Sequence, residues 1–186
     1  MPLRVIASPT RIARAGRSRG DFVVPVLVFL AGLALGACQE GAAPRPTPSE
    51  RPAISARGYP LAGLEIERDG RVRLELQVEI AETPEAWGKG LMGVERLDRR
   101  AGMAFLFPGR VRAPFFMKDV AIPLDIAFWD ENSRIVDGFT MQPCAADPCP
   151  LYPPSAGYVG AIEMNGGLLA ESGIELGDVV TLARRR

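Results

Sequence analysis

The sequence predicts an all-β domain with minor helix: a small antiparallel β-sandwich or barrel carrying one or two short helices. Residues 71–80 alternate apolar and polar side chains without a break, which is the period of a strand with one face on a core. Short apolar segments follow along the chain, and turns rich in Gly and Pro separate them. Long helical periods are missing from this part of the sequence, so sheet rather than helix should dominate.

The first 37 residues differ in composition from the rest. Five arginines precede an apolar run over residues 22–37, and this run is shorter than the roughly 20 residues that a membrane span needs. A basic region, a short apolar core and small residues before a cut site are typical of a secretory signal peptide. We therefore expect residues 1–37 to be a lipoprotein signal peptide that is removed on export.

The end of that segment carries a further motif. Leu35-Gly36-Ala37-Cys38 resembles the bacterial lipoprotein signal, in which the cysteine is acylated and becomes the first residue of the mature chain. Gln39 follows where an aspartate would resemble the signal for inner-membrane retention, which favours the outer membrane. The expectation is lipidation at Cys38 and a domain that faces the periplasm. The alternative is an ordinary signal peptide with an incidental cysteine.

Residues 38–62 are dense in Pro, Ala, Ser and charged side chains, a composition that predicts a semi-extended tether. The β domain should then occupy residues 63–186.

The chain that remains after cleavage is mildly acidic. Five of the 22 basic residues and one of the 22 acidic residues lie in the first 37 positions, which leaves 17 positive against 21 negative charges. A mildly acidic mature chain argues against a nucleic-acid partner, because such binding requires a basic stripe.

The hairpin signal is the clearest in the chain. Asp69-Gly70 is a turn dipeptide, and the strand after it places Val72 and four further apolar residues on its core face. Thr83-Pro84 can then cap and begin a short helix that runs to about Lys89. Later strands are expected at residues 103–107, 111–118, 124–130, 133–141, 157–164 and 179–183, with a short helix over 168–173.

Cys144 and Cys149 remain as a pair if Cys38 is lipidated. They lie in PCAADPCP, a segment without helical or strand period. In an oxidising compartment they should form a structural disulfide, which is worth about 2 kcal/mol on the chain-entropy model. A redox or metal pair is the alternative, but the four-residue spacer is unlike a thioredoxin centre and the chain has no histidine to complete a zinc site.

Several short motifs in a fixed order resemble the domain of unknown function 192 family over residues 63–186. These motifs are Gly90-Leu91-Met92, Gly102-Met103 with Phe105, Phe116-Met117-Lys118, Pro123-Leu124-Asp125-Ile126, the cysteine loop with Tyr152, Glu163 with Asn165 and Gly167, and Gly177-Asp178. The resemblance implies a jelly-roll-like sandwich or barrel that often follows a signal peptide, and it implies no established activity. Phe116 and Asp119-Val120 depart from the tryptophan and Asn-Thr pair of many relatives.

Charged residues within an apolar stretch make the first candidate site. A buried charge without a partner costs several kcal/mol, so Lys118, Asp119 and Asp125 must reach solvent, backbone donors or opposite charges. Asp125 is expected to accept backbone N–H bonds near a turn, and Lys118 and Asp119 to form a solvated corner. The functional alternative is a concave ligand site around Lys118, Glu163 and Asn165, with Met117 and the two aspartates as further candidates.

The methionines and acidic residues of the domain suggest two other chemistries. Thioethers bind Cu(I), so a copper site is an alternative reading of five methionines in the domain: Met92, Met103, Met117, Met141 and Met164. The more ordinary role of methionine is as an adaptable core residue. Histidine-based catalysis is excluded because the chain has no histidine. A hydrolase or transferase would need Glu163 with Asp125, or Ser155 with Lys118.

The sequence thus predicts a non-catalytic binding or accessory module of the cell envelope, without a cofactor. Its partners would be the membrane, through the lipid anchor, and a small ligand, a glycan or an envelope protein. A periplasmic hydrolase or transferase, a purely structural accessory and copper binding remain as alternatives.

Overall fold

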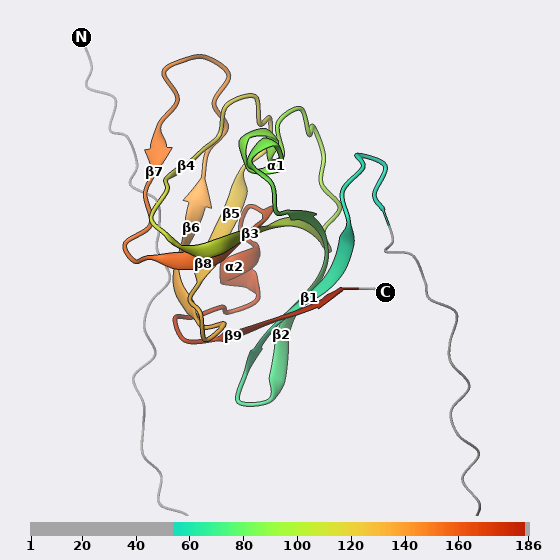
Figure 1. Ribbon diagram of the computed structural model, residues 1–186, viewed down its shortest axis with the longest axis vertical. Coiled ribbons are helices and arrows are strands. Elements are labelled where there is room, and N and C mark those ends of the chain that lie inside the picture. Colours follow the sequence, from blue (N-terminus) through green and yellow to red (C-terminus); the bar gives the residue numbers. More distant parts are fainter. Residues whose placement is uncertain (1–53, 185–186) are drawn as a thin grey trace, which may run out of the picture.

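The computed structural model describes residues 54–184, which form a curved main sheet with two short helices and a small second sheet (Figure 1). The predicted signal peptide, Cys38 and most of the predicted tether lie outside these residues. The elements in chain order are β1 (Leu61–Arg68), β2 (Arg71–Ala81), α1 (Pro84–Lys89), β3 (Ala101–Val111), β4 (Phe115–Phe116), β5 (Leu124–Trp129), β6 (Ile135–Met141), β7 (Leu151–Tyr152), β8 (Tyr158–Asn165), α2 (Leu168–Glu171) and β9 (Val179–Arg184). The predicted all-β, sandwich-like class with minor helix is confirmed.

The main sheet has seven strands in the order β6-β5-β8-β3-β2-β1-β9. It is mixed rather than purely antiparallel, because β2 and β3 pair in parallel from Gln77 opposite Ala101 to Ala81 opposite Phe105. This corrects the expected antiparallel architecture. A parallel pair needs a long crossover, and α1 together with the loop that follows it provides one between Ala81 and Ala101.

The two ends of the main sheet approach each other without closing a barrel. An isolated antiparallel bridge joins Arg134, just before β6, to Val179 at the start of β9. Backbone bonds from Ile135 N–H to the Asp178 carbonyl and from Val180 N–H to the Ser133 carbonyl hold this corner. The two-stranded sheet of β4 and β7 lies apart from the main one, and Phe116 is opposite Leu151 in it.

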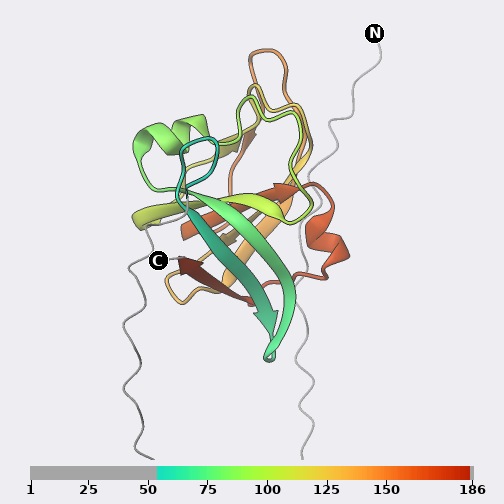
Figure 2. The same ribbon diagram turned by 90° about the vertical axis from the view of Figure 1, so that its right-hand side faces the viewer.

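The predicted β1–β2 hairpin is present with Asp69 and Gly70 at its turn, both at positive φ (52° and 71°). That conformation is the one required by the tight hairpin turn whose twist matches the strands. The alternation along β2 buries its apolar side chains from Leu74 onward, but Val72 is 54% exposed. The expected core position of Val72 is therefore wrong, because the hairpin tip extends beyond the body of the sheet (Figures 1 and 2).

The expected strand at 111–118 is also wrong. Strand β3 continues to Val111, through Pro108-Gly109, and only Phe115 and Phe116 then pair as β4. The change of direction places Met117 beside the cysteine loop, where its carbonyl accepts the Cys144 N–H. The alternation of apolar and polar residues cannot show this change of direction, because the change is determined by the segment with which the chain pairs and not by the side chains of residues 111–118.

Both short helices begin where side-chain oxygens meet their first turns. Thr83 Oγ1 accepts the N–H of Ala86 at the start of α1, as predicted, and Pro84 occupies the first position. At α2 the N-cap is Gly167, which has no side chain to accept a bond, and Asp125 of β5 supplies the acceptor for Leu169 N–H instead. No helix of residues 54–184 is long and apolar enough to span a bilayer.

Two hydrophobic cores cover the two faces of the main sheet. The α2-side core takes Leu168 and Leu169 of α2 together with apolar residues of β1 and β2. The α1-side core takes Ala86 of α1 and the large side chains Phe105, Phe128, Phe139 and Tyr158. In Figure 2 the two helices lie on opposite sides of the sheet. Every residue of β5 is buried, because this central strand has a core on each face.

Two further contacts fix loops to the sheet. Arg68 at the end of β1 donates from Nε to Oδ1 of Asp178 at 2.6 Å and from Nη2 to Oδ2 at 2.9 Å. The Asp178 carboxylate raises the pKa of Arg68 above its ordinary value, and the two hydrogen bonds anchor the turn before β9. The predicted disulfide between Cys144 and Cys149 is formed and closes the loop between β6 and β7.

Candidate functional site

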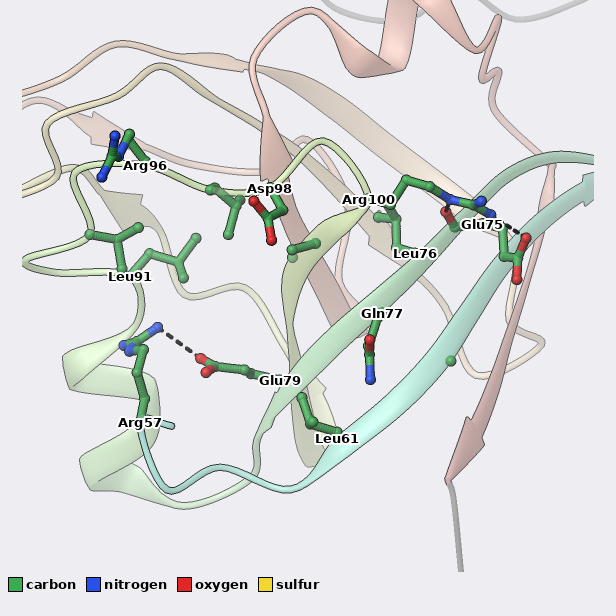
Figure 3. Close-up of a pocket in the computed structure, with 15 residues that line it drawn as sticks. Arg57, Leu61, Glu75, Leu76, Gln77, Glu79, Leu91, Arg96, Asp98 and Arg100 are labelled. Carbon is green, nitrogen blue, oxygen red and sulfur yellow. Dashed lines mark hydrogen bonds and ion pairs between the residues drawn. The ribbon is translucent and has the colours of Figure 1, made fainter. Parts of the chain in front are cut away.

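Two neighbouring hollows on the α1 side of the described residues differ in chemistry. The larger, of about 590 Å³, is a polar cleft lined by residues of β1, β2 and the 91–102 segment (Figure 3). The smaller, of about 270 Å³, is lined by apolar and aromatic side chains. Leu91 lines both, so the two hollows are neighbours.

The larger cleft satisfies most of its own charges. Arg57 donates to Glu79 at 2.8 Å, and Arg100 pairs with Glu75; Figure 3 shows both contacts across the cleft. These pairs are at least partly open to solvent, where an ion pair contributes about 0–1 kcal/mol. The cleft is therefore a hydrated surface on which opposite charges already meet, and its chemistry does not single out a ligand.

The smaller hollow, which we call the Glu163 cavity, is built from several elements. Helix α1 and the turn after it form one wall, β3 and β8 form the floor, and the β4 region forms the other wall. Its described lining residues are Trp87, Gly88, Lys89, Gly90, Leu91, Met92, Phe105, Phe107, Ala113, Pro114, Phe115, Phe116, Val120, Tyr158 and Glu163. Glu163 is the sole acid among them.

Strand pairing explains why Glu163 reaches this cavity. It lies on β8, directly opposite Met103 of β3 on one side and Ile126 of β5 on the other. Directly opposed residues share one face of a sheet, so the carboxyl emerges among apolar side chains of the α1-side core. Glu163 is 4% exposed. No hydrogen bond or ion pair joins its carboxyl to another of residues 54–184. The carboxyl oxygens are not fully buried, because Oε2 of Glu175 is the one fully buried polar side-chain atom of these residues that lacks a partner.

Burial governs the protonation state of this group. Desolvation raises the pKa of Glu163 to about 8, and the positive charge of Arg57 opposes that rise. At neutral pH the carboxyl is mainly protonated, and in that state it can donate a hydrogen bond as well as accept one. An approaching positive charge would instead favour ionisation. The cavity floor can therefore present either a neutral or an anionic group.

The aromatic lining is held in place by ring contacts. Trp87 stacks on Phe107 with centroids 4.8 Å apart, and its Nε1 donates to the carbonyls of Ala81 and Leu106. Phe107 meets Tyr158 edge to face at 5.4 Å. Such pairs add about 0.5–1.5 kcal/mol beyond their buried area. These contacts make the wall of the cavity well ordered before any ligand arrives.

Tyr158 and the rim complete the cavity. The Tyr158 hydroxyl donates to the Ala113 carbonyl at 2.8 Å, and burial raises its pKa to about 12, so it stays neutral. Phe116 lines the cavity with 40% of its surface exposed, and Leu151 beside it is 64% exposed. The rim is therefore apolar on the β4–β7 side. Lys89, at the last turn of α1, adds an exposed cation to the lining.

The structure separates the candidate residues of the apolar stretch from this cavity. Lys118 pairs with Asp147 of the cysteine loop, whose carboxylate raises the Lys118 pKa. Asp119 is exposed at positive φ (56°), and its backbone bonds to Gly93 and Cys144. Neither residue lines the Glu163 cavity. Met117 is fully buried in the α1-side core.

Asp125 and Asn165 hold structural elements together. The Asp125 carboxylate accepts from Thr140 Oγ1 at 2.6 Å and from Leu169 N–H at 2.7 Å. It thus accepts a backbone donor as expected, although from α2 rather than from the preceding turn. Asn165 Nδ2 donates to the carbonyls of Leu97 and Asp98, which fixes the loop before β3. Of the candidate binding residues, Glu163 alone lines the cavity.

The pairs considered for catalysis are not assembled. Asp125 lies opposite Met164 whereas Glu163 lies opposite Ile126, so the two carboxyl groups emerge on opposite faces of the sheet. Ser155 donates its N–H to Asp137, and Lys118 pairs with Asp147.

The methionines considered for copper binding are divided between the two cores. Met103, Met117 and Met141 share the α1-side core, whereas Met164 packs in the α2-side core. Residues 54–184 contain no cluster of three His, Cys, Asp or Glu that could hold a metal ion.

Sequence reasoning missed the aromatic wall. Trp87, Phe107 and Phe115 come from three separate segments, and nothing in their spacing brings them together. One signal was available: Glu163 is a lone acid in the apolar strand segment GAIEM, where a strand covered on both faces would bury it.

Comparison with known proteins agrees with this description. The crystal structure of a protein of unknown function from Novosphingobium aromaticivorans is 27% identical, with a TM-score of 0.62 over 76% of this chain and 99% of that one. A "putative transcription regulator" from Sinorhizobium meliloti has the same fold at 22% identity, with a TM-score of 0.59 over 67% of this chain and 95% of the other. No curated protein matches significantly. The model of the domain of unknown function 192 family, described as "Uncharacterized ACR", matches residues 64–182, and the chain therefore belongs to that family.

Proposed function

We propose that this protein is a non-catalytic binding module of the bacterial cell envelope, which takes a small and mainly apolar molecule into the Glu163 cavity. One observation carries the proposal: Glu163, a residue that is 4% exposed, lines an apolar cavity, and its carboxyl has no hydrogen-bond or ion-pair partner among residues 54–184. An apolar hollow with a few convergent polar groups is the usual form of a small-molecule site.

Glu163 costs the fold free energy, because its carboxyl is desolvated although its oxygens are not fully buried. Met103 and Ile126 on either side show that an apolar residue would suit this position. A role in ligand contact accounts for a polar group at a place where architecture alone would favour leucine or methionine.

Binding is favoured over catalysis by the count of reactive groups. Hydrolysis by a carboxyl pair requires two acids on either side of the reacting bond, about 5–9.5 Å apart. The described lining of the cavity holds one acid, and Asp125 emerges on the other face of the sheet. The raised pKa of Glu163 would suit a general acid, but the second carboxylate that the reaction needs is not among the lining residues.

The envelope location rests on two separate features. The motif before Cys38 predicts acylation of that cysteine, and Gln39 favours the outer membrane. The disulfide between Cys144 and Cys149 supports an oxidising compartment, because thiols in the cytosol are kept reduced. Attachment through Cys38 would leave the domain facing the periplasm on the 38–62 segment.

Trp87 emission provides a test of binding, because this side chain lines the cavity whereas Trp129 packs in the α2-side core. We expect small apolar probes to shift the emission of the wild-type domain. Ala113→Trp, at an exposed lining position, should block the mouth and weaken binding at least tenfold. Ala170→Trp, exposed on α2 at the other side of the sheet, is the matched control. Equal binding by both variants would contradict the assignment of the cavity.

Attachment to the membrane needs its own experiment. Cells grown with labelled palmitate should incorporate the label into wild-type protein and not into Cys38→Ser, while Cys149→Ser should remain labelled. Label that persists in Cys38→Ser would refute lipidation at this residue without affecting the binding proposal.

A further inference from the structure

We propose, building on the proposed function, that the ligand of the Glu163 cavity is an organic cation: an alkyl- or arylammonium whose charge meets the Glu163 carboxylate and whose apolar part lies among the aromatic side chains.

The Glu163 carboxyl lacks a basic hydrogen-bond partner among residues 54–184. A buried carboxylate is normally matched by a basic group, and Arg57 is the cation whose charge acts on Glu163. Arg57 nevertheless donates to Glu79 and to the Gly90 carbonyl, so its hydrogen bonds are directed elsewhere. The carboxyl therefore faces the cavity as an acceptor that the described part of the chain leaves open, and a ligand cation would complete the pair.

The lining of the cavity is rich in aromatic side chains. Six aromatic residues line it: Trp87, Phe105, Phe107, Phe115, Phe116 and Tyr158. A cation within about 6 Å of an aromatic ring face is attracted by the ring quadrupole. Aromatic walls around a single acid are the arrangement that retains an ammonium group while excluding water from its apolar substituents. A neutral apolar molecule would use the walls but leave the acid without a charged partner.

Competing ligands are discriminated by the charge state of Glu163. Above its pKa of about 8 Glu163 is a carboxylate, and in this apolar environment it would repel an anion. Lys89 is an exposed cation in the lining, at the end of α1, and it would repel a ligand ammonium. Because Lys89 is in contact with solvent, its field is weakened there, whereas Glu163 acts in a desolvated site. The balance favours the positively charged ligand.

Binding of such a ligand has a proton balance that can be measured. The ammonium arrives already protonated and Glu163 arrives mainly as the neutral acid, because its pKa is about 8. Formation of the ion pair breaks the Glu163 O–H bond and releases that proton to solvent. The other charged or titratable groups facing the site are Arg57, Lys89 and Tyr158, and the pKa of Tyr158, at about 12, keeps it neutral throughout.

Isothermal titration calorimetry of the wild-type domain with n-hexylammonium, 1-hexanol and hexanoate tests the inference. The affinity for n-hexylammonium should rise about tenfold per pH unit from pH 6 to 8 and level off by pH 9, because the carboxylate form is the one that binds. At pH 9, n-hexylammonium should bind at least tenfold more tightly than 1-hexanol, and hexanoate should be the weakest. Measured proton release should approach one per ligand at pH 6.

Matched variants assign the effect to the cavity. Glu163→Gln keeps the shape of the side chain and should abolish the pH dependence and the preference for n-hexylammonium over 1-hexanol. Glu171→Gln makes the same change in an exposed ion pair on α2 and should leave both intact. If Glu163→Gln does not fold, the comparison of the three probes on wild-type protein decides the question by itself.

The outcomes separate the two proposals. Binding of 1-hexanol as tight as that of n-hexylammonium, or affinity for the ammonium that falls above pH 8, would overturn the cation inference and leave a binding cavity in place. Failure of all three probes to bind or to change Trp87 emission would overturn both the inference and the proposed function.

Discussion

Arg57 lowers the pKa of Glu163 by its charge but directs its own hydrogen bonds to Glu79 and to the Gly90 carbonyl. Arg57 lines the polar cleft and Glu163 lines the apolar cavity, and Leu91 borders both hollows. The charge of the guanidinium therefore acts on the carboxyl across the wall between the cleft and the cavity. A substitution of Arg57 in the cleft should change the pKa of Glu163 in the cavity.

Replacement of Arg57 tests this relationship directly. Arg57→Gln removes the charge that favours the ionised form of Glu163, so the pKa of Glu163 should rise above its wild-type value of about 8. Carbon-detected NMR titration of the Glu163 carboxyl measures it. Arg100→Gln removes a second arginine from the same cleft and serves as the control. An unchanged Glu163 pKa in Arg57→Gln would show that desolvation alone sets it.

The stability of the domain should fall as pH rises across the neutral range. The folded pKa of Glu163, about 8, lies above its ordinary value of 4.5, so the folded state holds this proton over a range in which the unfolded chain has lost it. The contribution is complete below about pH 4.5 and is lost as pH rises to about 8. We expect a loss on the order of a few kcal/mol in the free energy of unfolding.

Urea denaturation at pH 5 and pH 9 provides the measurement for that linkage. Glu163→Gln has no group to titrate at this position, so the difference in stability between it and the wild type should grow in favour of the variant as pH increases. Parallel curves for the two proteins would mean that Glu163 titrates near its ordinary pKa and is better hydrated than its 4% exposure indicates.

Gly102 should not tolerate any side chain. A Cβ at this position would lie 2.6 Å from the Glu163 carbonyl oxygen, in the pairing between β3 and β8. Gly102→Ala must displace one of these strands, and we expect a loss of about 2 kcal/mol or more in the free energy of unfolding. Gly109→Ala, where the added atom meets nothing within 4 Å, should have little effect. Equal melting temperatures would contradict the close approach of the strands.

Asp125 should be required as a carboxylate. Asp125→Asn keeps an oxygen for the Leu169 N–H, and its amide N–H₂ can donate to Thr140 Oγ1 once that hydroxyl turns to accept. Both bonds then lose their charged acceptor or its direction, and because hydrogen bonds to charged groups are the stronger ones we expect a loss of about 1 kcal/mol. Asp147→Asn, at an exposed ion pair, is the control. Thermal denaturation should show a lower midpoint for Asp125→Asn, together with faster amide exchange in α2.

The small disulfide should contribute modestly. Cys144 and Cys149 are five residues apart, and closure of so short a loop stabilises the folded state by about 2 kcal/mol on the chain-entropy model. Urea denaturation of the double variant Cys144→Ser/Cys149→Ser measures the loss. Because Lys118 pairs with Asp147 inside that loop, Lys118 should become more mobile in the same variant. A loss above about 5 kcal/mol would indicate that the loop also supports the α1-side core.

Local patterns predict the local parts of this fold well. Asp69-Gly70 indicates the hairpin, Thr83-Pro84 indicates α1, and the spacing of Cys144 and Cys149 indicates the disulfide, because in each case the partners are near one another in sequence. The parallel pairing of β2 with β3 has no such signal. It depends on where the long loop after α1 returns, and that is decided by tertiary contacts such as those of Asn165 with the loop carbonyls.

The candidate site shows the same division. Lys118 and Asp119 are conspicuous as charges in an apolar stretch. The chain turns outward there beside the cysteine loop, so that both side chains are in contact with solvent. Glu163 lies in an ordinary-looking strand, and its position opposite Met103 and Ile126 makes it the unusual residue. Such opposition across three strands joins residues about 40 to 60 positions apart, which no local period encodes.

Strands β1 and β9 lie side by side, with Ala62 opposite Arg184, so the described chain begins and ends at one edge of the main sheet. A short peptide could therefore join the two ends without crossing the molecule, and new termini could be opened at Asp69-Gly70. Such a circularly permuted protein should retain its fold. An anchor fused to the new termini would hold the domain by its opposite pole, so that the domain would be presented to a surface in reverse orientation.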